Sequence, residues 1–325
     1  MAINARRLVT AVVVACALVG VAGSEGQAAD PFPTRPVQLV VVYPAGGGND
    51  LYCRAVASAA SDYIEQPLVA VIKSGGGGAV GTDFVAKAKP DGHTLACVDN
   101  GALVLMPQVQ KVPYSRADFV PVALITRIPF VLTVRGDSPW KSVQELVNEA
   151  KQNPGKVNAA IVGLMSSDHY AMALFAERAG IKFNYVTYGG GGPKVKAMLS
   201  GESKVDMLFP ALIVPHLKAG TMRPLAVAGA KRAPELPEVP TFKELGLDVE
   251  GYIWIALYAP KATPADRVEK LRRVVEKIVT QDASFKALMS RMGQSVDFMN
   301  GEQLARFEEE EARKSAEVIK GLGKK

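Results

Sequence analysis

The chain has 325 residues, of which 48% are hydrophobic and 22% charged, with 38 lysines and arginines against 32 aspartates and glutamates. A chain with this composition can bury a full apolar core, which excludes a disordered protein. Its length favours two domains over one. The net charge of +6 is spread out, without a basic block interleaved with aromatic residues, so a nucleic-acid-binding groove has no support.

The N-terminus is typical of a secretory signal. Arg6 and Arg7 precede an apolar run at 8–22, and a stretch of small and polar residues follows as far as Ala28. This is the order of charged, apolar and cleavage regions in a signal peptide, so we expect residues 1–28 to be removed on export. The apolar run is shorter than the roughly 20 residues that span a membrane, which disfavours a retained anchor.

Beyond the signal, short apolar runs alternate with amphipathic stretches. The runs are rich in valine and isoleucine and are bounded by proline, glycine or aspartate, which is typical of buried strands in a parallel sheet. The predicted strands are Val37–Tyr43, Leu68–Ile72, Thr94–Val98, Val122–Ile125, Phe130–Val134, Val157–Val162, Phe183–Tyr188, Val205–Phe209, Leu225–Ala228 and Ile253–Tyr258. Apolar residues with a helical period predict helices at Leu51–Tyr63, Val143–Lys151, His169–Ala179 and Val195–Leu199. This order predicts an α/β fold.

The end of the chain is predicted to be almost entirely helical. The predicted helices are Ala265–Thr280, Ser284–Met292 and Glu302–Ile319, and the acidic run Glu308–Glu311 predicts a solvated face. We find no internal repeat and no low-complexity linker, which two lobes joined by crossing strands would explain. We therefore expect one lobe to comprise residues 29–127 and 251–325, and the other to comprise residues 128–250.

Two cysteines, Cys53 and Cys97, remain after removal of the signal. An oxidising compartment permits a disulfide between them, but the sequence does not show whether their Cα atoms approach closely enough. The interpretation that we favour is a pair of buried, unbridged thiols, one in a helix and one in a strand. His93, His169 and His216 are not spaced like zinc ligands, so we predict no metal and no cofactor.

The first glycine-rich loop, 43–50, lies between a predicted strand and a predicted helix. Gly46 to Gly48 permit a sharp turn and a close approach to a ligand, and Asn49 or Asp50 can cap the helix. Free N–H groups at a helix start bind anions, so we expect a carboxylate here. Leu51 stands where a dinucleotide fingerprint needs its last glycine. The alternative is a tight turn that binds nothing.

The second loop, 73–81, contains Gly76, Gly77 and Gly78 directly after a strand. It lacks the Lys-Ser/Thr pair that closes a P-loop, so nucleoside triphosphates are disfavoured. Ligands of open α/β sheets bind beyond the carboxyl ends of the strands, where the two loops would face one crevice. The alternative is a flexible loop without a ligand.

The third loop, 163–169, places Ser166, Ser167 and Asp168 at a predicted helix start, where hydroxyl and N–H groups can hold a second anionic group. His169 follows directly, but no G-x-S-x-G motif accompanies it, so a Ser-His triad has no support. We favour a structural histidine at the head of the helix.

These loops resemble those of the periplasmic receptors of the tripartite tricarboxylate transporter family, also called Bug receptors. Similar motifs occur in order at 35–50, 75–95, 121–124, 142–156 and 218–241, of which the last is the most family-specific. The resemblance implies a two-lobed periplasmic binding protein of the Venus-flytrap type, each lobe a sheet flanked by helices, with no catalytic residues. It also implies a small organic carboxylate as ligand and membrane permease subunits as partners. We expect a monomer in the periplasm.

The chain departs from the family pattern in three places. Asn49 stands where the family usually has threonine or serine, and Met165 replaces the second glycine of its Gly-x-Gly-Ser/Thr loop. The family's Pro-Tyr-Lys-Gly stretch is represented by 187–193, which has lost the lysine and gained two glycines. These changes predict a ligand that is less polar than a short hydroxylated di- or tricarboxylate, or differently shaped.

Together, the loops and the resemblance predict a ligand site built from both lobes. Its predicted residues are Tyr43, Ala45, Gly46, Gly47, Gly48, Asn49, Asp50, Gly76, Gly77, Gly78, Ser166, Ser167, Tyr188 and Asp206. Two alternatives stay open: a sensory receptor that delivers its closed form to a histidine kinase, and an exported hydrolase, for which the sequence locates no nucleophile, base and orienting group.

Overall fold

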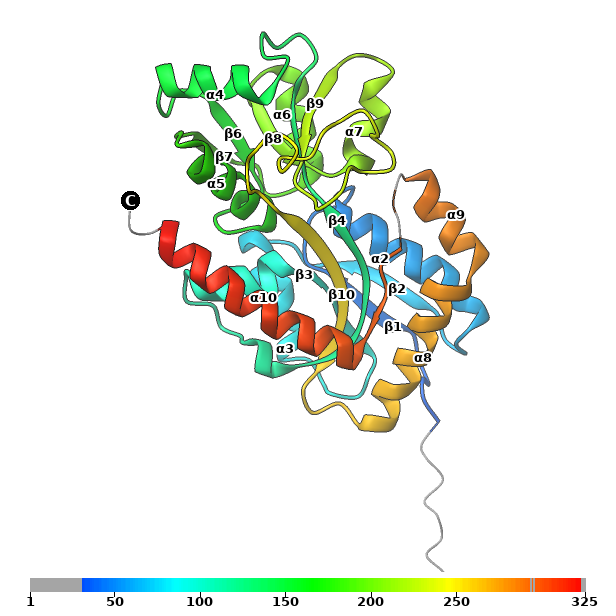
Figure 1. Cartoon of the computed structure of the whole chain (residues 1–325). Helices are drawn as coiled ribbons and strands as arrows, with labels where there is room; N and C mark the ends of the chain where they lie inside the picture. Colours follow the sequence, from blue (N-terminus) through cyan, green and yellow to red (C-terminus); the bar gives the residue numbers. More distant parts are fainter. Residues whose placement is uncertain (1–30, 293, 295, 323–325) are drawn as a thin grey trace, which may run out of the picture.

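A computed structural model describes residues 31–292, 294 and 296–322; the predicted signal lies outside these residues. The chain forms two mixed sheets, each flanked by helices, and Figure 1 shows them as two lobes, one above the other. The predicted α/β, two-lobed fold class is therefore confirmed.

The first sheet has the strand order β11-β4-β10-β3-β1-β2. Its strands are β1 (Val37–Val41), β2 (Leu68–Ile72), β3 (Thr94–Asp99), β4 (Phe119–Pro129), β10 (Tyr252–Pro260) and β11 (Met299–Asn300), and its helices are α2 (Gly48–Ala59), α3 (Ala79–Ala86), α8 (Ala265–Gln281), α9 (Ala283–Arg291) and α10 (Gly301–Leu322). Side chains of β1 alternate between two apolar clusters: Leu39 and Val41 pack with α2, α8 and α9, and Val40 packs with α3 and α10. Helices therefore cover both faces of this sheet.

The second sheet has the order β7-β6-β8-β5-β9. Its strands are β5 (Val131–Arg135), β6 (Asn158–Ile161), β7 (Asn184–Thr187), β8 (Val205–Leu208) and β9 (Met222–Val227), and its helices are α4 (Val143–Gln152), α5 (Ser167–Ala179), α6 (Gly191–Ser200) and α7 (Pro210–Leu217). The helices α5, α6 and α7 each begin within a few residues of a strand end. Their N-termini are therefore brought to the edge that faces the first sheet (Figure 1).

The prediction that the apolar runs are strands of a parallel sheet is wrong for the strands that connect the lobes. β10 runs antiparallel to β3 and β4, and β5 runs antiparallel to β8 and β9. The chain leaves the first sheet along β4 and returns along β10, so these two neighbours must point in opposite directions. Since β4 and β10 pass between the lobes, we propose that the lobes divide as predicted, at about residues 127/128 and 250/251.

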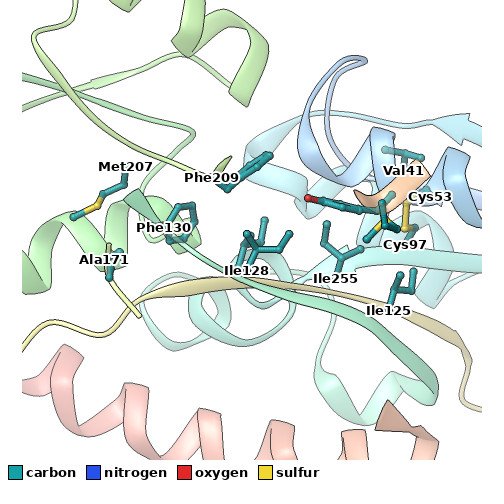
Figure 2. Packing of buried hydrophobic residues seen from close by; sticks show 14 of the residues in the cluster. Val41, Cys53, Cys97, Ile125, Ile128, Phe130, Ala171, Met207, Phe209 and Ile255 are labelled. Carbon is teal, nitrogen blue, oxygen red and sulfur yellow. A yellow bond between two sulfur atoms is a disulfide. The ribbon is translucent and has the colours of Figure 1, made fainter. Parts of the chain in front are cut away.

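The apolar core is continuous between the lobes, as Figure 2 shows from Met207 and Phe130 on one side to the two cysteines on the other. Cys53 on α2 and Cys97 on β3 form a disulfide with their Cα atoms 6.3 Å apart. The favoured interpretation of unbridged thiols is therefore wrong. The bridge ties α2, the helix that follows the first glycine loop, to the centre of the first sheet.

Two local predictions also differ from the structure. Helix α2 begins at Gly48 with Gly47 as its N-cap, so neither Asn49 nor Asp50 caps it. The predicted solvated face at 308–311 is wrong for two of its residues, because Glu308 and Glu311 accept hydrogen bonds from the hydroxyls of Tyr258 and Tyr252. Residues three apart share a helix face, and here that face is turned inward, where burial raises the pKa of both glutamates.

Candidate functional site

A small cavity lies between the two sheets. Its walls include the first glycine loop and Asp99 from the first lobe, and the third loop, the start of α6 and the end of β8 from the second lobe. Its volume is about 40 Å³, which holds a few water molecules. A larger ligand therefore requires the lobes to separate.

The first glycine loop is fixed from within and brought into contact with the opposite lobe. The Gly46 N–H donates to Asp50 Oδ2 at 3.0 Å, and Arg54 Nε donates to Asp50 Oδ1 at 2.7 Å, so Asp50 holds the turn. A Cβ atom on Gly48 would lie 2.5 Å from Phe209 Cζ. The aromatic ring at the end of β8 therefore rests directly on the backbone of this loop.

The second loop reaches the cleft but does not line the cavity. Gly77 and Gly78 have φ values of 64° and 99°, which glycine adopts without strain. A Cβ atom on Gly78 would lie 3.2 Å from the Tyr43 ring, and one on Gly163 in the other lobe would lie 3.7 Å from Gly77 Cα. The loop therefore supports Tyr43 and touches the third loop across the cleft.

The third loop is held by its own side chains. The Ser166 hydroxyl lies 2.6 Å from both the Gly163 carbonyl oxygen and Asp168 Oδ1. Asp168 Oδ2 accepts a hydrogen bond of 2.9 Å from the Val162 N–H. These bonds close the turn. Met165 has a φ of 54°, in the left-handed region, where a side chain costs about 1 kcal/mol. This left-handed conformation explains why the family pattern has a glycine where this chain has Met165.

Ser167 joins the third loop to the other lobe. Its hydroxyl donates to Asn100 Oδ1 at 2.7 Å, and the Asn100 amide donates to the Tyr252 carbonyl at 3.1 Å at the start of β10. Ser167 and Asn100 are both buried. The bond therefore belongs to the closed arrangement of the lobes.

A buried ion triad lies at the wall of the cavity, which Asp168 and Lys194 line and Asp206 does not. Lys194 Nζ on α6 is 2.6 Å from Asp168 Oδ2 and 2.6 Å from Asp206 Oδ1, and the lysine side chain is 2% exposed. Burial by itself lowers the pKa of Lys194, but the two carboxylates outweigh it and raise that pKa above its usual value. Burial raises the pKa of Asp206 to about 7. Two carboxyl groups thus share one ammonium.

A third buried carboxyl group, that of Asp99, faces the cavity from the end of β3. Its Oδ1 accepts hydrogen bonds from the Tyr43 hydroxyl and the Ala102 N–H, both at 3.0 Å. Burial raises the pKa of Asp99 to about 7, and the nearby charge of Asp168 contributes in the same direction. This carboxyl group is therefore poised between its two protonation states near neutral pH.

Asn49 offers an unused donor. It lines the cavity in the first turn of α2, is 2% exposed, and its buried Nδ2 has no hydrogen-bond partner among the described residues. A buried amide without a partner is costly, so such a group indicates a missing acceptor.

The structure brings together part of the predicted site. The predicted residues that line the cavity are Tyr43, Gly47, Gly48, Asn49, Ser166 and Ser167. Asp206 does not line the cavity but pairs with Lys194, which does. Tyr188 also lies outside the lining, and burial together with the nearby Glu202 raises its pKa. The remaining predicted residues lie in the two glycine loops without lining the cavity: Ala45, Gly46, Asp50, Gly76, Gly77 and Gly78.

His169 has a structural place. Its Nδ1 accepts a hydrogen bond of 2.9 Å from the Met165 N–H, and its ring packs edge-on against Tyr185. Burial lowers its pKa, so the ring is neutral and stabilises the third loop. The described residues contain no cluster of histidine, cysteine, aspartate and glutamate that could hold a metal ion.

Sequence reasoning missed Asp99, Lys194 and Phe209. Lys194 carried a signal, since it shares a helix face with the buried Ala197 and Met198. A lysine on a buried helix face needs a buried carboxylate as its partner. Asp206 was a candidate for this partner, because it lies in a strand of four buried residues. No comparable pattern marked Asp99 as a cavity residue.

Comparisons with known proteins agree with this arrangement. The model of the tripartite tricarboxylate transporter family receptor matches residues 52–324. The protein BugT of Bordetella pertussis is 31% identical over 329 residues, which cover 99% of each chain. No helix among the described residues is long and apolar enough to cross a membrane.

Two of the solved structures to which this chain is similar contain a bound carboxylate. A Rhodopseudomonas palustris protein with adipate is 30% identical, with a TM-score of 0.84 over 90% of this chain and 99% of its own. MatC of Rhodopseudomonas palustris with bound malate is 27% identical, with a TM-score of 0.83 over 89% of this chain and 100% of its own. The whole two-lobed chain, not one lobe, is therefore similar to these proteins.

Proposed function

The chain belongs to the family of tripartite tricarboxylate transporter receptors, which are periplasmic solute-binding proteins, and from this premise we propose that it captures a small organic carboxylate between its lobes. We also propose that residues 1–28 are removed on export and that the closed, monomeric complex is delivered to the membrane permease of such a transporter.

One observation carries the proposal. The N-termini of α2, α5 and α6 meet at one cavity, which is lined by backbone from Gly47, Gly48, Gly190 and Gly191. Each helix N-terminus presents free N–H groups and a partial positive charge, so three together favour an anion. The unpartnered amide of Asn49 adds a donor at the same place. The adipate and malate bound to two similar proteins support a carboxylate as that anion.

Thermal unfolding of the purified mature protein with a panel of carboxylates tests the proposal. A ligand that binds only the native state stabilises it by RT ln(1 + [L]/Kd), about 2.7 kcal/mol at a hundredfold excess over Kd. We expect at least one carboxylate to raise the melting temperature while its concentration, followed by NMR, stays constant. Consumption of the ligand would contradict a receptor, and a panel without any stabilising carboxylate would contradict carboxylate binding.

The permease partner needs its own test. Membrane vesicles that contain the permease subunits should take up labelled ligand only when the receptor is added. Uptake that does not depend on the receptor would contradict this part of the proposal.

A further inference from the structure

Strand β2 is an edge of the first sheet, and no described strand pairs with its outer side. The N–H group of Lys73 donates to the Val41 carbonyl of β1 at 2.9 Å. Backbone groups alternate in direction along a strand, so Leu68, Ala70 and Ile72 direct their N–H and C=O groups away from β1. An extended segment can therefore bond to these groups as an added strand.

Apolar side chains are exposed along this edge. Leu68 packs in the cluster on the α2 side of the sheet, so Val69, the next residue, points to the α3 side. Val69 and Ile72 of β2 are exposed, as are Val80 and Phe84 of α3. These four are half of the large hydrophobic side chains that are exposed among the described residues. Such a group of apolar side chains on a surface marks an interaction site.

Lys73 adds a charge at the end of β2. Its Nζ lies 4.1 Å from the centre of the Phe84 ring, and it forms no ion pair with a described residue. The ring attracts the ammonium but carries no net charge, so this cation can still pair with a carboxylate of a partner. A second copy of this chain, paired antiparallel about Ala70, would place Pro67 opposite Lys73 and supply no carboxylate. The charge therefore favours a different partner.

The surface continues onto the other lobe. Leu164 of the third loop is 61% exposed, more than any other large hydrophobic side chain among the described residues. A Cβ atom on its neighbour Gly163 would lie 3.7 Å from Gly77 Cα, in the loop that joins β2 to α3. Leu164 is therefore held close to this loop only while the lobes are together. The complete surface is a property of the closed form.

From these observations we propose that the outer side of β2, with Val69, Phe84 and Leu164 around it, is the docking surface for the permease that receives the closed form. An extended segment of the permease adds to β2 as a strand, its apolar side chains contact the exposed ones, and one of its carboxylates pairs with Lys73. The open form lacks Leu164 at this place, which lets the permease distinguish the two forms. The inference rests on the proposed function and adds the surface and the mode of docking.

Uptake by vesicles that contain the permease subunits tests the proposal, with the receptor saturated by a labelled carboxylate from the thermal-unfolding panel. Saturation removes differences in ligand affinity, so the receptor concentration at half-maximal uptake reports docking. Ala70→Pro removes an N–H group that points away from β1, a change that an edge strand tolerates. We expect it to raise this concentration at least tenfold.

Thr187→Pro is the matched control on β7, the edge strand of the second sheet. The Tyr188 N–H donates to the Ile161 carbonyl of β6, so the N–H group of Thr187 points away from that sheet. This variant should change the half-maximal concentration less than twofold. The melting temperatures of both proline variants check that they fold.

Side-chain variants test the surface without a change in the backbone. Phe84→Ser, Leu164→Ser and Lys73→Gln should each raise the half-maximal concentration at least threefold. Leu245→Ser, at an exposed leucine that lies beside α4, should leave it unchanged.

Wild-type values in Ala70→Pro and Phe84→Ser would overturn the docking surface, while uptake that depends on the receptor leaves the proposed function standing. Uptake that needs no receptor would overturn both. Binding to vesicles without the permease that is lost in Phe84→Ser would assign the surface to lipid. Self-association in light scattering that is lost in Ala70→Pro would assign it to a second copy. Either of these last two results also overturns the proposal.

Discussion

The hydroxyl of Ser167, at the head of α5, lies 2.7 Å from Oδ1 of Asn100, which directly follows β3 in the other lobe. This buried bond can exist only while the lobes are together. Ser167→Ala should therefore weaken ligand binding by about 1 kcal/mol, or about fivefold, because it removes a bond of the closed state.

Calorimetry and the radius of gyration of the ligand-bound protein, measured by solution scattering, check this prediction. The control Ser200→Ala removes a hydroxyl bond that stays within α6, to the Ala197 carbonyl. It should change neither quantity. Full compaction and wild-type affinity in Ser167→Ala would show that the bond does not contribute to closure.

The contact between Gly48 and Phe209 predicts a steric block. A methyl group at Gly48 would lie 2.5 Å from Phe209 Cζ, so Gly48→Ala should hinder closure and lower ligand affinity. The free protein should keep its stability, since alanine is favourable in a helix. Adding Phe209→Ala should recover part of the lost affinity.

Gly192→Ala is the matched control for this pair. Gly192 also lies in the first turn of a helix at the cleft, but a Cβ atom there meets no atom within 4 Å. Affinity should be unchanged. Equal losses in the two glycine variants, or no recovery with Phe209→Ala, would argue against a collision with the ring.

Removal of the ammonium group from the buried triad should be severe. Lys194→Met leaves Asp168 and Asp206 without their shared cation, and breaking a buried pair from one side costs about 3–5 kcal/mol. The double variant Lys194→Met/Asp206→Asn should regain part of this loss. Lys196→Met, on the exposed side of the same helix, should be close to neutral. Urea denaturation measures all three, and equal stabilities of the two lysine variants would refute the prediction.

The disulfide should contribute substantially to stability. Cys53 and Cys97 are 44 residues apart, and closing a loop of this size stabilises a protein by about 4 kcal/mol in the chain-entropy model. Reduction should lower the free energy of unfolding by a similar amount. In Cys53→Ala/Cys97→Ala the reductant should have no effect, which controls for its other actions. Detection of both thiols in the unreduced mature protein would contradict the bridge.

Asp99 should give the free protein a characteristic pH dependence. Its pKa of about 7 in the folded protein lies above the ordinary 3.8, so the native state binds more protons than the unfolded state between these values. The stability contribution of this group is complete below about pH 4 and is lost as the pH rises to about 7. The groups that face it are Tyr43, Tyr114 and Asp168.

Asp99→Asn removes this dependence. The stability of the variant relative to wild type should therefore rise from pH 4 to pH 7 and stay level above, as measured by urea denaturation across that range. A relative stability that falls with pH would mean that the Asp99 carboxyl group is stabilised in its ionised form.

The sequence predicted most of the elements and the loops of the site because these depend on local patterns. Glycines after strands, and small polar residues before helices, indicate where backbone N–H groups are free. The first and third loops accordingly line the cavity. The second loop instead supports Tyr43, since its direction depends on packing against Ala102 and Met106.

What could not be predicted depends on contacts between distant segments. The Cys53–Cys97 bridge required the distance between α2 and β3, and the Ser167–Asn100 bond joins residues 67 positions apart. The Glu308–Glu311 run looked solvated because composition does not show which face of a helix meets two tyrosine hydroxyls. The sequence showed that Met165 departs from the family pattern, but it did not show that the backbone of this residue is left-handed.

The pairing of β4 with β10 also determines how the second lobe is joined to the first. Pro129 and Tyr252 are direct partners in the ladder, so the chain leaves and re-enters the first sheet at adjacent points. The second lobe is therefore a large insertion at the tip of what would otherwise be a β-hairpin. A chain in which a short turn joined these two residues would keep every strand of the first sheet, so this sheet needs no strand from the second lobe to be complete.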